Sequence, residues 1–149
     1  MRLTARVDYA LRAACALAAA QAEGGQSLTT EKVAVSEGVP HRFLEAILRE
    51  LRRAGLVASK RGPEGGHMLA LPADQVSIAD VIRAIDGPLA LVRNLRPEQL
   101  QYTGASRHLQ DVWISLRASE REILQSTTLE AVVRGELPEV ARRHLAAGD

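Results

Sequence analysis

The feature that most constrains the fold is the stretch from Pro40 to Leu71, which joins an amphipathic helix to a short hairpin. In its first half, apolar residues recur at spacings of three and four, which places them on one face of a helix. These apolar residues are Phe43, Leu44, Ile47, Leu48 and Leu51. The opposite face is mostly polar, with His41, Arg42, Glu45, Arg49, Arg52 and Arg53. The second half has two apolar runs around the Gly/Pro-rich tip 61–66, which indicates two strands joined by a turn.

A helix with an arginine-rich face followed by a basic hairpin is typical of a winged helix-turn-helix. In such a domain the helix suits the DNA major groove, and the hairpin, or wing, reaches a neighbouring groove. The residues before Pro40 agree with this interpretation, because a short helix from Thr29 or Thr30 to Ser36 is followed by a turn at Gly38. Proline fits the first turn of the next helix, so the order is helix, turn, helix.

Basic charge is concentrated in the same stretch, although the whole chain carries a formal charge of only +1. Residues 1–71 have ten Lys/Arg and seven Asp/Glu, a net charge of +3, whereas residues 72–149 have nine and eleven, a net charge of −2. Residues 40–61 have six basic and two acidic residues, a net charge of +4. This is where a DNA-facing surface would need basic charge. A solvated helix face beside a hairpin would carry the same charge, so both interpretations stay open here.

Composition and length predict a mainly α-helical protein that is either one domain or one small domain with an appendage. The 149 residues are 46% hydrophobic but only 3% aromatic, so the core is expected to be mostly Leu, Ala, Val and Ile, a composition that suits helices. The absence of an apolar run of about 18 residues predicts no membrane span, and we expect a cytoplasmic protein. The single cysteine, Cys15, excludes an internal disulfide. Its place on the apolar side of a helix favours a core residue over a redox switch.

The pattern divides the chain into four regions. Residues 1–87 form the winged-helix domain, which begins with a helix from Leu3 to Ala22 and ends with a helix that Ser77 and Asp80 cap. Residues 88–106 connect it to the rest and are a candidate sensing region. Residues 107–135 form a long helix and a short one that Thr128 can cap, and residues 136–149 form a tail.

The long helix, from Arg107 to Ser126, has an apolar stripe but little left in its own chain to bury against. We therefore expect it to form a homodimer; the alternative is a helix folded back on its own domain. The candidate interface residues are Leu109, Val112, Trp113, Leu116, Ile123 and Leu124.

Several motifs occur together in one order. These are MRLTARVDYALRA at the start, GLV-x-S-x-RGPEGGHMLA at the wing, SIADVIRAIDG, and Trp113 followed by Thr128-Leu129. Over about residues 1–135 the chain resembles the Rrf-two family of bacterial transcription regulators. The resemblance implies a homodimeric winged-helix protein that binds double-stranded operator DNA, usually as a repressor.

The resemblance also implies which residues meet DNA. Arg42, Phe43 and Glu45 match recognition-helix positions, and Arg61 matches a wing residue that enters a minor groove. Glu45 can accept a hydrogen bond from a cytosine amino group, and Arg42 can contact a guanine or a phosphate. Phe43 is either such a residue or part of the core. The full candidate set is Arg2, Arg6, His41, Arg42, Phe43, Glu45, Arg49, Arg61, Gly62, Gly65 and Gly66. Arg2 and Arg6 begin the first helix, whose N–H groups suit a phosphate.

The sequence departs from the family members that hold an iron–sulfur cluster. Those members place three cysteines before the dimer helix, and residues 88–107 contain none. Thiolates are the ligands that such clusters require. Asp8 matches a carboxylate ligand of some members, but an ion pair with Arg12, four residues on, is the simpler role. His108 lies near the position of the missing cysteines, but it would be a single candidate ligand. We therefore expect no metal and no cofactor.

Other classes of protein fit less well. The GPEGG tip lacks the Gly-Lys-Ser/Thr ending of a phosphate-binding loop, and the four histidines lack metal spacing, so we do not expect an enzyme. The main alternative is a protein-interaction module that acts through a partner such as a metabolic enzyme. The sequence does not identify the effector. It could be a small molecule near residues 88–106 or a partner protein, or the regulator could have no effector.

Overall fold

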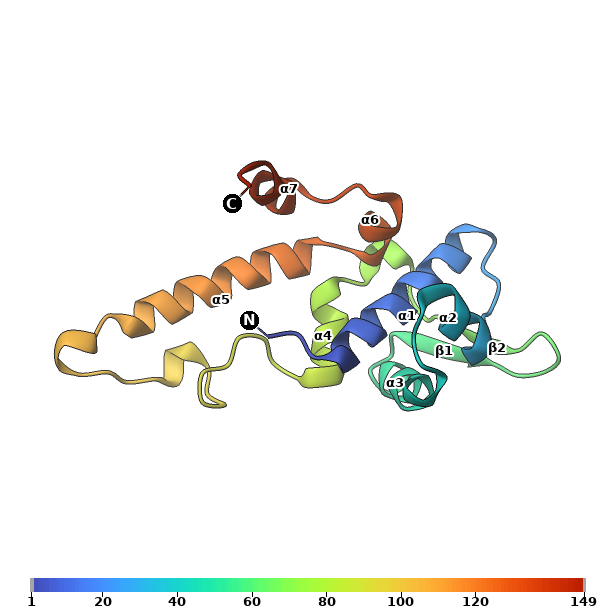
Figure 1. Ribbon diagram of the computed structural model, residues 1–149, viewed down its shortest axis with the longest axis horizontal. Helices are drawn as coiled ribbons and strands as arrows, with labels where there is room; N and C mark the ends of the chain where they lie inside the picture. The colour runs from blue at the N-terminus through green and yellow to red at the C-terminus, as the bar shows by residue number, and fades with distance from the viewer. Residues whose placement is uncertain (1, 149) are drawn as a thin grey trace.

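The computed structural model describes residues 2–148 and is mainly α-helical with a two-stranded antiparallel sheet (Figure 1). The first part of the chain forms α1 (Ala5–Ala22), α2 (Thr30–Glu37), α3 (His41–Arg53), β1 (Val57–Lys60), β2 (Gly66–Leu69) and α4 (Ile78–Asp86). The second part forms α5 (Leu109–Ser126), α6 (Leu129–Arg134) and α7 (Glu139–Ala146). Short 3-10 turns lie at Ala73–Gln75, Pro97–Gln99 and Gly104–Ser106. This architecture confirms the predicted fold class.

Helix α1 is the centre of the core and contacts α2, α3, α4, α6 and β2. Its buried face is rich in alanine, whose small side chain lets neighbouring helices pack closely: Ala10, Ala13, Ala14, Ala16, Ala18 and Ala20. The helix begins two residues later than the sequence pattern suggested, because the Thr4 side chain caps it by accepting a hydrogen bond from the Val7 N–H at 3.2 Å. Leu3, expected in the buried stripe, precedes this cap and is exposed.

The helix-turn-helix follows from local signals in the sequence. Thr29 caps α2, and Gly38 ends it in the left-handed conformation with φ 63°. Pro40 then precedes α3, which buries Leu44, Ile47 and Leu48 together with Leu51. These residues confirm the apolar stripe, with Phe43 as its exposed exception.

The wing is attached to the start of α2. In the hairpin Val57 pairs with Leu69 and Lys60 with Gly66. An extra bridge joins Leu28 to His67, so the Leu28 carbonyl lies very close to the wing. A Cβ atom on Gly66 would lie 2.4 Å from that carbonyl oxygen, so the bridge requires glycine here.

The chain returns to the first domain after α5. The Leu129 N–H donates to the Val76 carbonyl at 2.9 Å, and the Leu129 side chain is fully buried in the main core. Helix α6 therefore completes the core that α1 organises, although the sequence pattern grouped it with the dimer helix. Between α4 and α6, the segment 88–106 and α5 extend as an arm (Figure 1).

The segment expected to be a tail contains helix α7. Pro138 precedes its first turn, and Arg143 of α7 forms an ion pair with Glu122 of α5 at 3.6 Å. The helix was not anticipated because it has no buried residue and so leaves no strong apolar stripe in the sequence.

Candidate nucleic-acid interface

The exposed face of α3 presents polar side chains on successive turns. Arg42, Glu45 and Arg49 are all exposed, and they lie opposite the buried leucines of the same helix. His41 at the start of the helix contacts Glu31 of α2 at 3.1 Å. The pKa of Glu31 is lowered, first by a hydrogen bond from the backbone N–H of Glu31 itself and then by the contact with His41. The predicted recognition helix thus has an open polar face beside α2.

Phe43 is not part of the buried core, but its side chain still packs against a neighbouring helix. Its side chain is 38% exposed and packs against Tyr9 of α1, with the ring centroids 5.5 Å apart. The guanidinium carbon of Arg42 lies 4.8 Å from the centre of the Phe43 ring, and that of Arg12 lies 5.9 Å from the Tyr9 ring. These two cation–π contacts flank the aromatic pair at the surface, and the pair packs α3 against α1 at the start of the predicted DNA-contacting residues.

The wing tip exposes Arg61 next to a tight backbone turn. Gly62 has φ 103°, and a Cβ on Gly65 would lie 2.4 Å from the Lys60 carbonyl oxygen. Glycine is therefore needed to close the tip, which positions Arg61 at its exposed edge. Behind the tip, Arg52 of α3 donates to the Ser59 hydroxyl at 2.5 Å and links the helix to β1.

The structure gives different surroundings to the two arginines at the N-terminus. Arg2 is exposed ahead of α1. Arg6 forms an ion pair with Glu50 and so links α1 to α3. Nearby, Asp8 and Arg12 form the expected ion pair at 2.8 Å.

Two lysines outside the predicted set lie beside the wing. A pocket of about 350 Å³ between the start of α2 and the hairpin is lined by Lys32, Lys60 and Thr29, among others. Lys60 lies next to Arg61 in the sequence, so its position could have been anticipated. The position of Lys32 could not have been anticipated, because long-range contacts such as the Leu28–His67 bridge bring α2 beside the wing.

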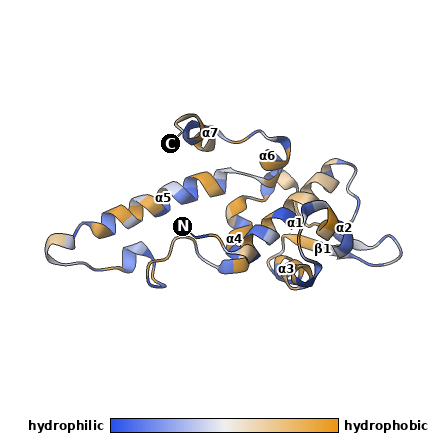
Figure 2. Ribbon diagram, in the orientation of Figure 1, coloured by the Kyte–Doolittle hydropathy of each residue, from blue (hydrophilic) through white to orange (hydrophobic). Residues whose placement is uncertain are grey.

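The candidate dimer residues of α5 fall into two groups. Leu109, Val112 and Leu116 share one face and are 40%, 53% and 44% exposed, so this face presents apolar side chains to solvent. The ribbon of α5 carries both hydrophobic and hydrophilic residues along its length (Figure 2). Trp113 is half-buried and donates from its indole N–H to the Tyr102 hydroxyl at 3.0 Å, and Ile123 is also half-buried. Leu124 packs within its own chain, in a small cluster with Val7, Ala79, Ile82 and Leu89. The exposed stripe is therefore Leu109, Val112 and Leu116.

The residues present do not fit an iron–sulfur cluster. Burial, and then the charge of Glu37, raise the pKa of Cys15 to about 11, so this thiol is a poor source of thiolate. Asp8 is paired with Arg12, and His108 contacts Asp111 at 3.1 Å. Within residues 2–148, no group of three or more His, Cys, Asp or Glu side chains is arranged to hold a metal ion.

The helix-turn-helix, the wing and their polar outer surface define a winged-helix regulator of the DNA-binding class. The chain belongs to the Rrf2 (Rrf-two) family, since the family model described as "Iron-dependent Transcriptional regulator" matches residues 3–135. This match confirms the resemblance carried by the sequence motifs. The protein is therefore a transcriptional regulator of the Rrf2 family.

Similar proteins and solved structures support the assignment to this family. A putative HTH-type transcriptional regulator of Mycobacterium tuberculosis is 48% identical over 139 residues, which cover 93% of this chain and 85% of that protein. The HTH-type transcriptional regulator CymR of Bacillus subtilis is 35% identical, with 87% and 88% covered. The structure of CymR, the global cysteine regulator of B. subtilis, is also similar. It matches with a TM-score of 0.77 at 29% identity, over 90% of this chain and 97% of that one. A structure of IscR from T. potens matches with a TM-score of 0.73 at 27% identity, over 91% and 88%.

These relatives are regulators, a class that generally acts by binding rather than by catalysis, in line with the expectation that the chain is not an enzyme.

Among the helices of residues 2–148, none combines the length and apolarity needed to span a membrane.

Proposed function

We propose that this protein is a cytoplasmic repressor that binds an inverted-repeat operator as a homodimer, without an iron–sulfur cluster. The observation that carries the DNA-binding part is the open polar face of α3, with Arg42, Glu45 and Arg49, placed beside a wing that exposes Arg61. Guanidinium groups can pair with guanine edges or phosphates, and a carboxylate can accept from cytosine. We expect repression because the resemblance to the family implies that role.

The dimer is supported by the exposed apolar stripe of α5. Leu109, Val112 and Leu116 recur at spacings of three and four on a helix that has no buried residue in the single chain. Packing this face against a second copy removes apolar surface from water, which is the main driving force of stable association. A two-fold dimer presents two recognition helices, so its operator should be an inverted repeat.

The cluster-free state is supported by ligand chemistry. The chain has one cysteine, and that thiol is held in its protonated form by partial burial. Protein purified without oxygen is expected to be colourless, and its DNA binding should be insensitive to iron chelators. Stoichiometric iron and sulfide together with visible charge-transfer bands would contradict this part of the proposal.

The DNA-binding proposal can be tested by selecting sequences from a random pool of duplex DNA with the purified chain. We expect enrichment of an inverted repeat. Fluorescence anisotropy on that repeat should then show that Arg61→Ala weakens binding by about 1–3 kcal/mol, the usual cost of losing a groove-bound arginine. Arg142→Ala on α7 is the matched control, and its affinity should equal that of the wild type. No enrichment, or equal affinities for Arg61→Ala and the wild type, would count against the assignment.

A further inference from the structure

A second concave site lies away from the DNA-facing surface. A pocket of about 460 Å³ lies between the end of α4, the segment that follows it and α5. Four arginines line it, contributed by three separate parts of the chain: Arg83, Arg96, Arg117 and Arg121. The remaining lining residues are Gly87, Pro88 and Leu89, which carry no charge. The pocket is large enough for a small metabolite.

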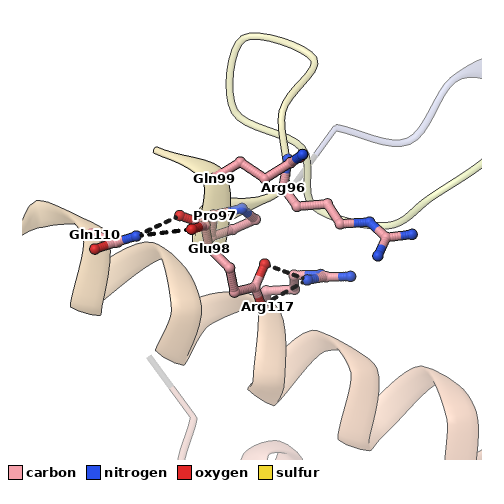
Figure 3. A network of polar contacts seen from close by, with 6 residues as sticks. All are labelled: Arg96, Pro97, Glu98, Gln99, Gln110 and Arg117. Atoms are coloured by element: carbon pink, nitrogen blue, oxygen red, sulfur yellow. Dashed lines mark hydrogen bonds and ion pairs between the residues drawn. The ribbon is translucent and has the colours of Figure 1, made fainter. Parts of the chain in front are cut away.

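Two of these arginines form ion pairs with carboxylates that lie outside the pocket lining. Glu98 accepts two hydrogen bonds from one Arg117 nitrogen, at 2.8 and 2.7 Å (Figure 3). An Asp80 carboxylate oxygen lies 3.7 Å from an Arg83 guanidinium nitrogen. A hydrogen bond from its own backbone N–H, and then the charge of Arg117, lower the pKa of Glu98, so this carboxylate is ionised at neutral pH. Neither acid lines the pocket. The charged side chains that line the pocket are thus all arginines, which makes its lining positively charged.

A polar network next to Arg96 and Arg117 joins the segment before α5 to α5 itself (Figure 3). The Gln110 side chain of α5 donates to the carbonyl oxygens of Pro97 and Glu98 at 3.2 and 3.3 Å. The Arg117 side chain is only 15% exposed, and its Nε has no hydrogen-bond partner among the described residues. Arg117 therefore lines the pocket with its side chain held in place and part of its hydrogen-bonding capacity unused.

We propose that this pocket binds a small anion that carries two or more carboxylate or phosphate groups. Guanidinium groups match the planar geometry of both kinds of group, and several of them on one concave wall favour a ligand with more than one charge. Binding of this anion would be the regulatory input to the repressor, so this role rests on the proposed function.

The pocket is linked to the recognition helix by direct packing. Leu89 lines the pocket and packs in one small cluster with Val7 of α1. Arg6, the residue directly before Val7, forms the ion pair with Glu50 of α3. An anion that draws the segment around Leu89 toward α5 would act on the same contacts that position α3.

The binding test uses isothermal titration calorimetry on the full chain, with citrate and pyrophosphate as the carboxylate and phosphate probes. Ionic strength is held constant with chloride. We expect saturable binding of at least one probe, with about one site per chain. The double variant Arg96→Gln/Arg121→Gln should bind at least about tenfold more weakly, because charge-assisted hydrogen bonds are lost. Arg93→Gln is the matched control, since it removes an arginine from the same segment but outside the pocket, and it should bind like the wild type.

Operator affinity without added anion separates this inference from the proposed function. If the chain binds its operator but neither probe binds at millimolar concentration, the inference fails and the proposed function stands. Equal anion binding by the double variant and the wild type would also overturn it. If the double variant loses operator affinity in the absence of any anion, these arginines contact DNA, and the pocket is not an effector site.

Discussion

The Phe43 ring of α3 packs on the Tyr9 ring of α1 with their centroids 5.5 Å apart and their planes tilted by 31°. This contact lies at the surface, next to Arg42, and joins the recognition helix to the central helix of the core. Aromatic pairs of this geometry contribute about 0.5–1.5 kcal/mol beyond the area they bury. The pair thus gives Phe43 a positioning role, whether or not it touches DNA.

Replacing the phenylalanine should therefore affect stability and DNA binding together. Phe43→Ala is expected to lower the free energy of unfolding by about 1–2 kcal/mol, less than a fully buried Phe would cost, because the ring is 38% exposed. It should also weaken operator binding. Urea unfolding and fluorescence anisotropy would measure the two effects. Tyr9→Phe keeps the ring pair and serves as the control. An unfolding curve for Phe43→Ala that overlays that of the wild type would refute the positioning role.

The lone thiol should be slow to react. Because burial raises the pKa of Cys15 from 9.0 to about 11, the folded protein at pH 8 holds about a hundredfold less thiolate than the unfolded chain. Alkylation by iodoacetamide should be slower by a similar factor in buffer than in urea, as followed by mass spectrometry. Its rate should keep rising with pH up to about 11. A rapid reaction at pH 7 in the folded protein would instead support a redox role.

The wing should make stability depend on pH through His67. Burial, and then the charge of Arg52, lower the pKa of His67, whose Nε2 lies 3.2 Å from the Thr30 hydroxyl. A histidine with a lowered pKa in the folded state stabilises the protein above its unfolded pKa, and this contribution is lost as the pH falls. The free energy of unfolding should thus fall between pH 7.5 and pH 5, a window set by the usual histidine pKa of about 6.5.

Comparison with His67→Gln isolates that contribution. The decrease in unfolding free energy over the same pH range should be smaller in the variant, as measured by urea titration at each pH. His144→Gln on the exposed face of α7 is the control and should retain the full decrease. If His67→Gln and the wild type lose stability in parallel, His67 does not cause the pH dependence.

A charge on the exposed stripe of α5 should break the dimer. Leu116→Arg places a guanidinium in the middle of a face that we propose to be buried, and burying an unpaired charge is strongly unfavourable. Sedimentation at micromolar concentration should show a dimer for the wild type and a monomer for this variant. Ala118→Arg lies on the opposite side of the helix and should remain dimeric. A wild-type chain that sediments as a folded monomer would contradict the dimer proposal.

Much of the DNA-binding unit could be predicted from the sequence because its signals are local. The apolar spacing of α3, the left-handed turn at Gly38 and the capping box of Ser77 and Asp80 each depend on residues within a few positions of one another. The same logic placed the polar face of α3 and the wing tip correctly on the surface.

What could not be predicted depends on contacts between distant residues. The ion pair of Arg6 and Glu50 spans 44 residues, and the return of α6 to α1 requires the whole arm to be in place. The four arginines of the pocket come from three separate parts of the chain, and no sequence pattern shows that these parts meet. Sequence periodicity reports which face of an element is buried, but not which other element covers it.

The central claim is that two copies of this chain bind one inverted repeat. The most direct measurement is a hydroxyl-radical footprint of the selected operator, combined with the mass of the complex from sedimentation equilibrium. The proposal predicts a footprint with two-fold symmetry, two protected half-sites about one helical turn or a multiple of it apart, and two chains per duplex. One chain per duplex, or protection that does not depend on the DNA sequence, would contradict it.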